Sequence, residues 1–520
     1  MSANSSSGAP GRHAALAIGA LAILYAISLA LGWPQDGTQA IVGQQVHHAE
    51  MGGEVEHADA LKVEAPPLWT VAPFVLMLAA IAILPLVPAV HHWWESNRSK
   101  LIVAGGLALV ALAYYAFLHE SAIDGHWPAH HVVSPGSGAL DTGFVRTVLE
   151  NAILQEYVPF IVLLFSLYSI SGGIRIEGDL QADPLTNAAF MAVGAVLASF
   201  IGTTGAAMLL VRPLLETNRE RKYVAHTIVL FIFIVCNCGG CLLPIGDPPL
   251  FLGYLEGVRF LWTMSLWKEW AFVNGMLLVV YVLIDRIFYY HRETIADIER
   301  DIEQAGRLRI TGWKVNVPLL VGVVLAVALL DPSKPFIGTD WHPWMYLREL
   351  VQLGLVGISL TLGDAAVRAK NQFNFGAIIE VAALFIGIFI CMQPALQILS
   401  VRGSELGIDT PPEFFWASGS LSSVLDNAPT YLVFFKTAQG LPQPEGAITE
   451  AGVEVGILAA ISLGSVFMGA MTYIGNGPNF MVKAIAESSG VKMPSFFGYM
   501  VYSFAILLPI LAAMVWLFMM

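Results

Sequence analysis

The chain carries one short motif twice, each time inside a long apolar segment. The first copy lies in "LLPIGDPPLFLGYL" (residues 242–255), and the second lies in "MTYIGNGPNFMVKAI" (residues 471–485). Both copies place Ile-Gly before an Asp or Asn and end in Pro-x-Phe. Because glycine and proline interrupt helices, the motif predicts two breaks in what would otherwise be membrane helices.

Composition indicates the class of protein. Of 520 residues, 56% are hydrophobic and only 12% are charged, which leaves too little polar surface for a water-soluble chain of this length. We therefore expect an all-α polytopic membrane protein, placed in the inner (cytoplasmic) membrane with the lipid bilayer as its surroundings. The net charge of −13 resides mostly in loops and says little about the substrate, and we expect no nucleic-acid partner.

Apolar runs predict where the chain crosses the membrane, because a helix needs about 20 apolar residues to span it. The predicted spans are 14–32, 69–90, 101–118, 153–172, 223–263, 267–290, 314–330, 346–362, 376–400, 452–487 and 495–519. Two of them, 223–263 and 452–487, are too long for one crossing, and each contains one copy of the motif. This length supports a discontinuous helix at each copy.

Two further apolar stretches, 185–217 and 411–438, are interrupted at their centres by "FIGTTGAAMLL" and "GSLSSVLDNAPTYLVFF". We interpret both as re-entrant hairpins, which enter and leave the membrane on the same side. With this arrangement most of the 26 Lys and Arg residues fall on the cytoplasmic side, as the positive-inside rule requires.

The same order of elements occurs twice along the chain. An N-terminal span and external polar loop (1–68) precede a first repeat (69–290), a cytoplasmic linker helix (291–313) and a second repeat (314–520). Each repeat has an odd number of crossings, so the second is expected to be inverted relative to the first. Residues 14–32 fit either a retained helix or a signal peptide.

The breaks themselves supply candidate residues. Gly246 and Gly475 allow the turn, Asp247 or Asn476 can cap the new half-helix, and Pro248 or Pro478 starts it. A mid-membrane carboxylate costs at least about 2.5 kcal/mol, whereas a cap returns roughly 1 kcal/mol. This difference favours a transport role for Asp247 over capping alone.

Polar residues beside the breaks and hairpin tips complete the predicted ion or substrate site. They are Asp426, Asn427, Ser422, Ser423, Thr430, Thr203, Thr204, Asn237 and Asn476. Glu156 and Glu380 occupy matching positions in the two repeats, either as proton carriers or as helix caps. Arg212 and Lys436 can serve as counter-ions, anchor an anion, or extend to the membrane surface.

The segments "NCGGCLLPIGDPPL" and "LSSVLDNAPTYLVF" resemble the paired signatures of the ion transporter superfamily. That superfamily includes NhaD-type sodium/proton antiporters, citrate and dicarboxylate carriers and arsenite pumps, and the resemblance covers roughly residues 69–519. It implies an elevator-type secondary transporter, usually a homodimer, with a scaffold domain and a transport domain. Within it, this chain is most similar to the antiporter branch and to a related group named for citrate transport.

Electrostatics distinguishes these branches. Dicarboxylate carriers of the superfamily typically present Ser-Asn-Thr at both hairpin tips, whereas this chain has Asp426 at one tip and Asp247 at one break. Two carboxylates repel an anion and attract Na⁺, and they can exchange it for protons. The sequence thus favours Na⁺/H⁺ antiport, with citrate or dicarboxylate transport as the alternative and an arsenite-type carrier as a further one.

Other features point to no additional chemistry. "CNCGGC" (Cys236, Cys238, Cys241) has spacing that can hold a soft metal, but small residues also suit close helix packing, and we expect no resident metal or cofactor. The histidine-rich segments fall in predicted loops. No histidine lies beside Ser or Cys in a predicted span, so we expect no enzyme.

Overall fold

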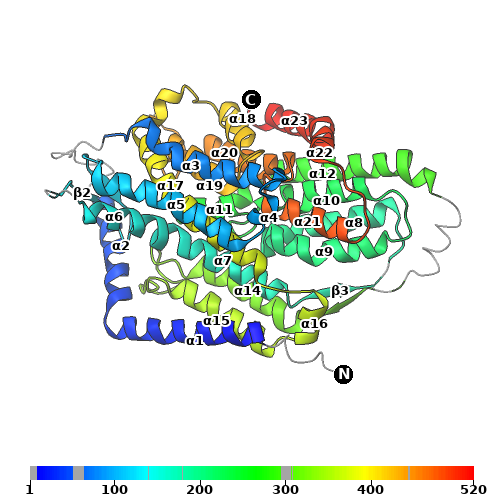
Figure 1. The fold of residues 1–520 in the computed structure, drawn as a ribbon, viewed down its shortest axis with the longest axis horizontal. Coiled ribbons are helices and arrows are strands. Elements are labelled where there is room, and N and C mark those ends of the chain that lie inside the picture. The colour runs from blue at the N-terminus through cyan, green and yellow to red at the C-terminus, as the bar shows by residue number, and fades with distance from the viewer. Residues whose placement is uncertain are drawn as a thin grey trace. The chain divides into compact units, whose positions relative to one another are not determined.

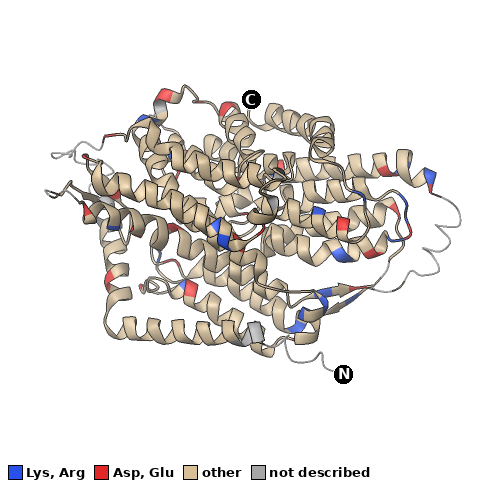
Figure 2. Ribbon diagram, in the orientation of Figure 1, with Lys and Arg blue, Asp and Glu red and all other residues tan. Residues whose placement is uncertain are grey.

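The structure is a computed structural model. It describes residues 9–50, 64–136, 138, 140–178, 180–293, 306, 308–442 and 446–520. These residues are mainly helical, with three short two-stranded antiparallel sheets, β1–β2, β3–β4 and β5–β6, among them. Figure 1 labels these elements along the ribbon, and Figure 2 shows that positions coloured as charged residues are sparse along the helices.

The chain divides into two compact units, each built from two separate segments. Unit 1 comprises Met1–Gly173 and Val315–Arg402, and unit 2 comprises Ile174–Lys314 and Gly403–Met520. Both predicted repeats, 69–290 and 314–520, contribute a part to each unit. Both predicted hairpins and both copies of the Ile-Gly motif belong to unit 2.

Unit 1 contains the helices that precede each predicted hairpin. Its elements, with η for short 3₁₀ or π helices, are α1 (Ala9–Ala30), α2 (Trp33–Glu50), η1 (Leu68–Val71), α3 (Ala72–Ile83), η2 (Leu84–Leu86), α4 (His91–Trp94), α5 (Asn97–Phe117), β1 (Ile123–Gly125), β2 (His131–Val133), α6 (Thr142–Leu149), η3 (Glu150–Tyr157), α7 (Val158–Ser171), α14 (Trp313–Leu329), α15 (Leu347–Leu362), α16 (Ala365–Lys370) and α17 (Gly376–Arg402).

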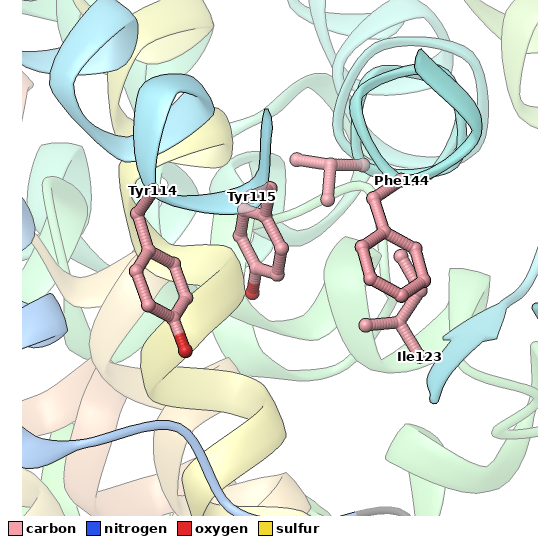
Figure 3. Packing of buried hydrophobic residues seen from close by; sticks show 5 residues of the cluster. Tyr114, Tyr115, Ile123 and Phe144 are labelled. Atoms are coloured by element: carbon pink, nitrogen blue, oxygen red, sulfur yellow. The ribbon is translucent and has the colours of Figure 1, made fainter. Parts of the chain in front are cut away.

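Small and aromatic residues pack unit 1. Gly387 of α17 lies against Ala104 of α5 so closely that a Cβ at residue 387 would sit 2.8 Å from the Ala104 Cα. Glycine thus lets the two helices meet backbone to backbone, as in other membrane helix pairs. Figure 3 shows a second contact region, where Tyr115 and Phe144 lie buried near β1.

The N-terminal region differs from the sequence prediction. Residues 33–50, expected as part of an external loop, form helix α2. The polar composition of α2 hides its helical character, but Thr38 Oγ1 donates to the carbonyl of Pro343 and Gly37 packs against Met345. Tertiary contacts of this kind stabilise a helix that has no apolar stripe of its own.

The span predicted at 153–172 also begins earlier than expected. Helix α6 starts at Thr142, where the Asp141 side chain accepts a hydrogen bond from the Phe144 N–H. It continues through the π-helical η3 into α7. The true helix start is marked by its capping residue, because the apolar run alone begins later.

Unit 2 contains the hairpins and the interrupted helices. Its elements are β3 (Arg175–Glu177), α8 (Pro184–Ile201), α9 (Thr203–Thr217), α10 (Ala225–Val235), η4 (Cys238–Cys241), α11 (Pro248–Leu255), η5 (Trp262–Leu266), α12 (Trp267–Ile284), η6 (Asp285–Tyr289), η7 (Tyr290–Arg292), β4 (Arg309–Thr311), η8 (Gly403–Leu406), α18 (Pro411–Ser422), α19 (Asn427–Gln439), β5 (Thr449–Glu450), β6 (Val453–Glu454), α20 (Val455–Met468), η9 (Gly469–Met471), α21 (Gly477–Ser488), α22 (Phe496–Tyr502), η10 (Ser503–Leu507) and α23 (Leu508–Phe518).

The predicted linker helix, 291–313, is largely outside the described residues. Where the structure does describe it, Arg309–Thr311 is a strand, β4, that pairs antiparallel with β3. The prediction of a helix throughout this segment is therefore wrong at its C-terminal end. Backbone hydrogen bonds to β3, more than one hundred residues earlier, give these residues an extended conformation that the local charge pattern does not indicate.

Candidate membrane-spanning helices are abundant among the described residues. Seven helices are long and apolar enough to cross a membrane, and shorter apolar helices accompany them. This finding confirms the predicted class, a polytopic helical membrane protein. Helix α8, from the first predicted hairpin, is one of the seven, so its length alone does not distinguish a crossing from a re-entrant helix.

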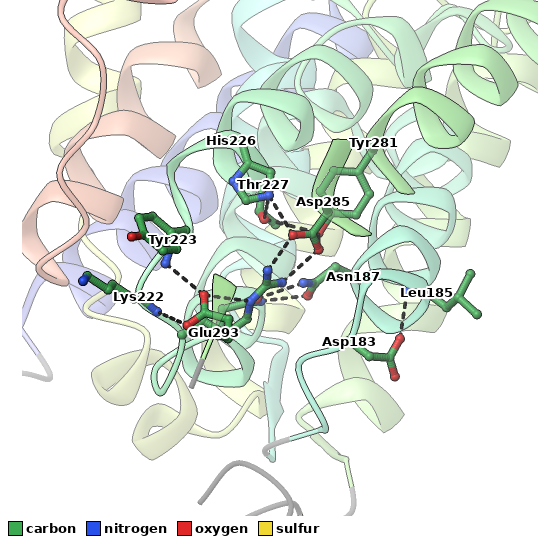
Figure 4. A network of polar contacts seen from close by, with 12 residues as sticks. Asp183, Leu185, Asn187, Lys222, Tyr223, His226, Thr227, Tyr281, Asp285 and Glu293 are labelled. Carbon is green, nitrogen blue, oxygen red and sulfur yellow. Dashed lines mark hydrogen bonds and ion pairs between the residues drawn. The ribbon is translucent and has the colours of Figure 1, made fainter. Parts of the chain in front are cut away.

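A buried ionic network anchors the end of α12 within unit 2 (Figure 4). The Asp285 carboxylate accepts hydrogen bonds from Arg221 Nη1 at 2.9 Å and from the Tyr281 hydroxyl at 3.0 Å, and His226 Nε2 lies 3.0 Å away. The Arg221 side chain is 4% exposed and that of Asp285 is fully buried. The network joins the α9–α10 loop to the beginning of α10 and the end of α12.

Candidate functional site

Each copy of the Ile-Gly motif marks an interrupted helix, as predicted. Helix α10 ends at Val235 and α11 begins at Pro248; likewise α20 ends at Met468 and α21 begins at Gly477. Between each pair lies a short 3₁₀ turn, η4 or η9. The two breaks are thus built alike.

The motif glycines are required for close approach. We predicted that glycine is needed here for the turn itself, which would be so if φ were positive. Neither Gly246 nor Gly475 has a positive φ. A Cβ at Gly246 would lie 2.2 Å from the carbonyl oxygen of Gly240, and one at Gly475 would lie 2.6 Å from that of Gly469. No side chain fits at such distances, so each break folds onto its own backbone.

Asp247 and Asn476 occupy the N-cap positions of α11 and α21, but neither side chain caps its helix. The predicted capping role is therefore wrong for both residues. Pro248 is the first residue of α11 and Pro478 the second of α21, where proline's missing N–H costs no helical hydrogen bond. The two polar side chains are left available for other partners.

The hairpin helices meet the breaks at their tips. Gly202, with φ of 80°, is the single residue between α8 and α9, which lie side by side in Figure 1. The Thr203 N–H donates to the Gly246 carbonyl at 2.8 Å, so the first tip is bonded directly to the first break. The second tip lies between α18 and α19 and ends at Asp426, the N-cap of α19.

Three neutral donors converge on the Asp247 carboxylate. Oδ1 accepts from Thr203 Oγ1 at 2.8 Å and from Asn476 Nδ2 at 3.1 Å, while Oδ2 accepts from Asn427 Nδ2 at 2.6 Å. The two hairpin tips and the second break therefore each contribute one donor to an acid from the first break. All four residues are buried, with Asp247 only 1% exposed.

The hydrogen bonds explain how a buried carboxylate is tolerated there. Each bond to an ionised group contributes about 1.5–3 kcal/mol, whereas the effective penalty for burying an ion is several kcal/mol. Three such bonds are needed to offset that cost. The hydrogen-bond partners of Asp247 among the described residues are neutral. The negative charge of Asp247 is therefore not balanced by a Lys or Arg among them, and a cation could bind to it.

A second layer of amides supports the donors. Asn476 Nδ2 also lies 3.0 Å from the Cys236 carbonyl and 3.2 Å from Asn237 Oδ1, and Asn237 Nδ2 donates to Asn479 Oδ1 at 2.8 Å. Asn479 in turn donates to the Gly469 carbonyl at 2.9 Å. This chain of amides connects the two breaks and holds Asn476 in place.

Sequence reasoning missed Asn479, although it lies inside the quoted motif. It is fully buried and replaces Leu250, its counterpart in the first copy of the motif. That difference between the copies was a usable signal, because a buried amide in a membrane helix must find partners.

Other predicted residues donate to main-chain carbonyls instead of to Asp247. Ser422 Oγ donates to the Ser465 carbonyl at 2.6 Å, Ser423 Oγ to that of Ser420, and Thr430 Oγ1 to that of Asp426. Thr204 is partly exposed at the first tip. These side chains satisfy helix carbonyls and make none of the hydrogen bonds to Asp247 described above.

Asp426, predicted as a site residue, is the N-cap of α19. Its Oδ1 accepts a hydrogen bond from the Ala428 N–H at 3.1 Å, so it does cap α19. It is less buried than Asp247, and it directly precedes Asn427, which donates to the Asp247 carboxylate. The structure thus places a second acidic group near the first without a direct hydrogen bond between them.

The remaining charged candidates make none of the hydrogen bonds to Asp247 described above. Lys436 forms an ion pair with Glu256 at the end of α11, and Arg212 lies along α9. Glu156 and Glu380 belong to unit 1. Glu156 is buried within η3 near Gln393 Nε2, at 3.4 Å, whereas Glu380 pairs with Lys100 at 2.6 Å, so the two matching positions have different surroundings.

The three cysteines of "CNCGGC" are buried free thiols. Their contribution at the break comes from the main chain, since the Cys236 carbonyl accepts from Asn476 and the Cys238 carbonyl accepts from Asn274 at 3.1 Å. In the part of the chain that the structure describes, no three His, Cys, Asp or Glu side chains form a group that could hold a metal ion.

Comparison with known proteins adds one finding. The family described as putative citrate transport matches residues 63–519. This match covers both units and every residue of the Asp247 cluster. No curated protein matches the chain.

Proposed function

Because the chain belongs to this citrate-transport family, we propose that it is a secondary transporter that carries a small polycarboxylate such as citrate together with a coupling cation. The observation that carries the proposal is the convergence of Thr203, Asn427 and Asn476 on one carboxylate. Hydroxyl and amide donors of this kind also bind the carboxylates of a substrate. The family match supports a transport function, and the three hydrogen-bond donors are of the kind that binds an anion.

The coupling cation follows from charge. Asp247 is buried and Asp426 lies near it, so a polycarboxylate entering this cluster meets charge of its own sign in a poorly solvated place. Like charges there repel strongly. Uptake of a proton or Na⁺ with the substrate removes this repulsion, which makes symport the mode of transport that the cluster favours.

The architecture supports a particular transport mechanism. We infer that α8–α9 and α18–α19 are re-entrant hairpins, that the two repeats are inverted, and that unit 2 is the moving part of an elevator-type homodimer in the inner membrane. Each hairpin tip supplies a donor to the same acid, and two interrupted helices end beside it, as transporters with inverted repeats place their sites. Of the two glutamates of unit 1, we propose Glu156 as a proton carrier and Glu380, which pairs with Lys100, as a structural residue.

Sodium/proton antiport, which the sequence favoured, is the second candidate. The observation in its favour is that the hydrogen-bond partners given to Asp247 by the described residues are neutral, so the carboxylate is available to exchange small cations. It now ranks second because the family match concerns citrate transport. No feature of the described residues specifically favours an arsenite-type carrier.

Reconstitution distinguishes the two candidates. Purified protein in liposomes is tested for uptake of radiolabelled citrate under inward proton or Na⁺ gradients, and for Na⁺-driven proton movement without citrate. We expect saturable, cation-dependent citrate uptake and no Na⁺-driven proton movement in its absence. Proton movement driven by Na⁺ alone, with no carboxylate uptake, would establish antiport instead.

A further inference from the structure

The Asp247 cluster is a carboxylate-binding cradle that already contains a carboxylate. Two oxygens, Oδ1 and Oδ2, receive hydrogen bonds from one hydroxyl and two amides, at 2.6–3.1 Å. The donors come from three separate elements, so their directions are set by the fold of unit 2. A substrate carboxylate has the same two oxygens with the same spacing, and it would accept the same three bonds.

The donors can exchange one carboxylate for another. Asn476 Nδ2 carries two hydrogens but lies within hydrogen-bond distance of three acceptors, the Cys236 carbonyl, Asn237 Oδ1 and Asp247 Oδ1. It can therefore release Asp247 and still use both hydrogens. Thr203 Oγ1 has a single hydrogen, so whatever accepts it excludes a second acceptor.

Asn427 carries the second independent observation. Its Nδ2 donates to Asp247, while its Oδ1 is buried and has no hydrogen-bond partner among the described residues. The residue is 1% exposed, and an unpartnered buried acceptor costs free energy. Rotation of the amide turns Oδ1 toward Asp247, where it can accept from a protonated carboxyl or face a bound cation. The cluster thus accommodates Asp247 in a neutralised state as well as the ionised one.

We propose that Asp247 is an internal substitute for the substrate: in the empty transporter it occupies the carboxylate subsite formed by Thr203, Asn427 and Asn476. When the coupling cation neutralises Asp247, the three donors are released and bind a carboxylate group of the polycarboxylate. Cation and anion binding are then obligatorily linked, because the same acid that receives the cation blocks the anion. This inference rests on the proposed function.

Within the part of the chain that the structure describes, the hydrogen-bond partners of Asp247 supply no positive charge that would make the cation unnecessary. Among the described residues, the charged group that acts on Asp247 is Asp426, at the start of α19, and Asp247 in turn acts on the thiols of Cys236, Cys238 and Cys241, at the end of α10 and in η4. All of these are neutral or negative. A cation must therefore enter with the substrate.

Binding of radiolabelled citrate to the purified full-length protein, with and without the coupling cation, tests the inference. The wild-type protein should bind citrate only with the cation. Asp247→Asn, which removes the competing charge, should bind citrate without the cation, with an affinity within a few-fold of that of the cation-saturated wild type. Glu216→Gln, which removes an exposed carboxylate from α9, is the matched control and should keep the wild-type cation requirement.

Two results would overturn the inference. The first is that the Asp247→Asn variant binds citrate with the same cation dependence as the wild-type protein. The second result concerns Thr203→Val, which removes one hydrogen-bond donor at nearly constant volume. This variant should bind citrate about 10- to 100-fold more weakly than the wild type at saturating cation. Unchanged binding would exclude Thr203 from the subsite, even if the Asp247 variant failed to fold. A wild-type protein that binds and transports no polycarboxylate would refute the proposed function itself.

Discussion

Asn427 Nδ2 donates a hydrogen bond to Asp247 Oδ2 at 2.6 Å, although 180 residues separate them in the sequence. The bond joins the tip of the second hairpin to the break in the first interrupted helix. Since Thr203 and Asn476 bond to the other oxygen of the same carboxylate, one acid holds both hairpins and both breaks together. Its charge is therefore expected to govern transport.

Asp247→Asn should abolish concentrative transport while leaving the protein inserted and folded. The amide keeps the size of the side chain but has no charge to receive the coupling cation. In proteoliposomes, accumulation of labelled citrate against its gradient should be lost, whereas exchange of internal for external citrate should continue. Normal cation-driven accumulation in this variant would contradict the role assigned to Asp247.

Asp426→Asn separates the capping role of Asp426 from the role of its charge. Asparagine caps a helix about as well as aspartate, so thermal unfolding of the purified variant should match that of the wild type. Cation-coupled uptake should nevertheless be lost, because the variant lacks the negative charge that directly precedes Asn427, the donor to Asp247. Wild-type uptake would show that Asp426 only caps α19.

Gly475→Ala should destabilise unit 2 and eliminate transport. The added Cβ would lie 2.6 Å from the Gly469 carbonyl oxygen and 2.8 Å from that of Ser422, and overpacking against backbone costs about 1–3 kcal/mol. Gly477, two residues later, has no atom within 4 Å of such a Cβ. Gly477→Ala should therefore be neutral in thermal unfolding and uptake, and equal behaviour of the two variants would refute the packing argument.

Asp285→Asn should lower thermal stability strongly. Breaking a buried ion pair from one side costs up to about 3–5 kcal/mol, because Arg221, with a side chain only 4% exposed, keeps its charge and only the longer contact with Glu293 at 3.7 Å. The matched control is Arg146→Gln in the surface pair with Glu150, where the arginine side chain is 76% exposed and the expected loss is about 0–1 kcal/mol. The comparison is made by thermal unfolding in detergent, and a similar shift for both would refute the structural role of the network.

Glu380→Gln should reduce stability and leave the coupling of transport unchanged. Glu380 is the partner of Lys100, whose side chain is 6% exposed, and removing it leaves a buried ammonium unpaired. Adding Lys100→Met should restore part of the loss. If Glu380→Gln were instead stable and took up citrate without proton movement, Glu380 would be a proton carrier.

Much of the fold was predictable because its signals are local. Apolar runs long enough to cross a bilayer marked the spans, and glycine and proline inside them marked the breaks at Gly246 and Gly475 and the hairpin turn at Gly202. Prediction failed where the chain depends on distant contacts. Helix α2 packs against residues near Pro343, and Arg309–Thr311 pairs with β3, so neither could be recognised from its own composition.

The sequence by itself determined that this is a membrane protein with two interrupted helices, and that Asp247 lies at one of them. Only the tertiary structure decided what Asp247 does there, because its three partners lie 44, 180 and 229 residues away. An aspartate before a proline looks like a cap in any sequence. Whether it caps depends on which donors the rest of the chain brings to it, and here three donors from other elements satisfy the carboxylate more completely than its own helix does.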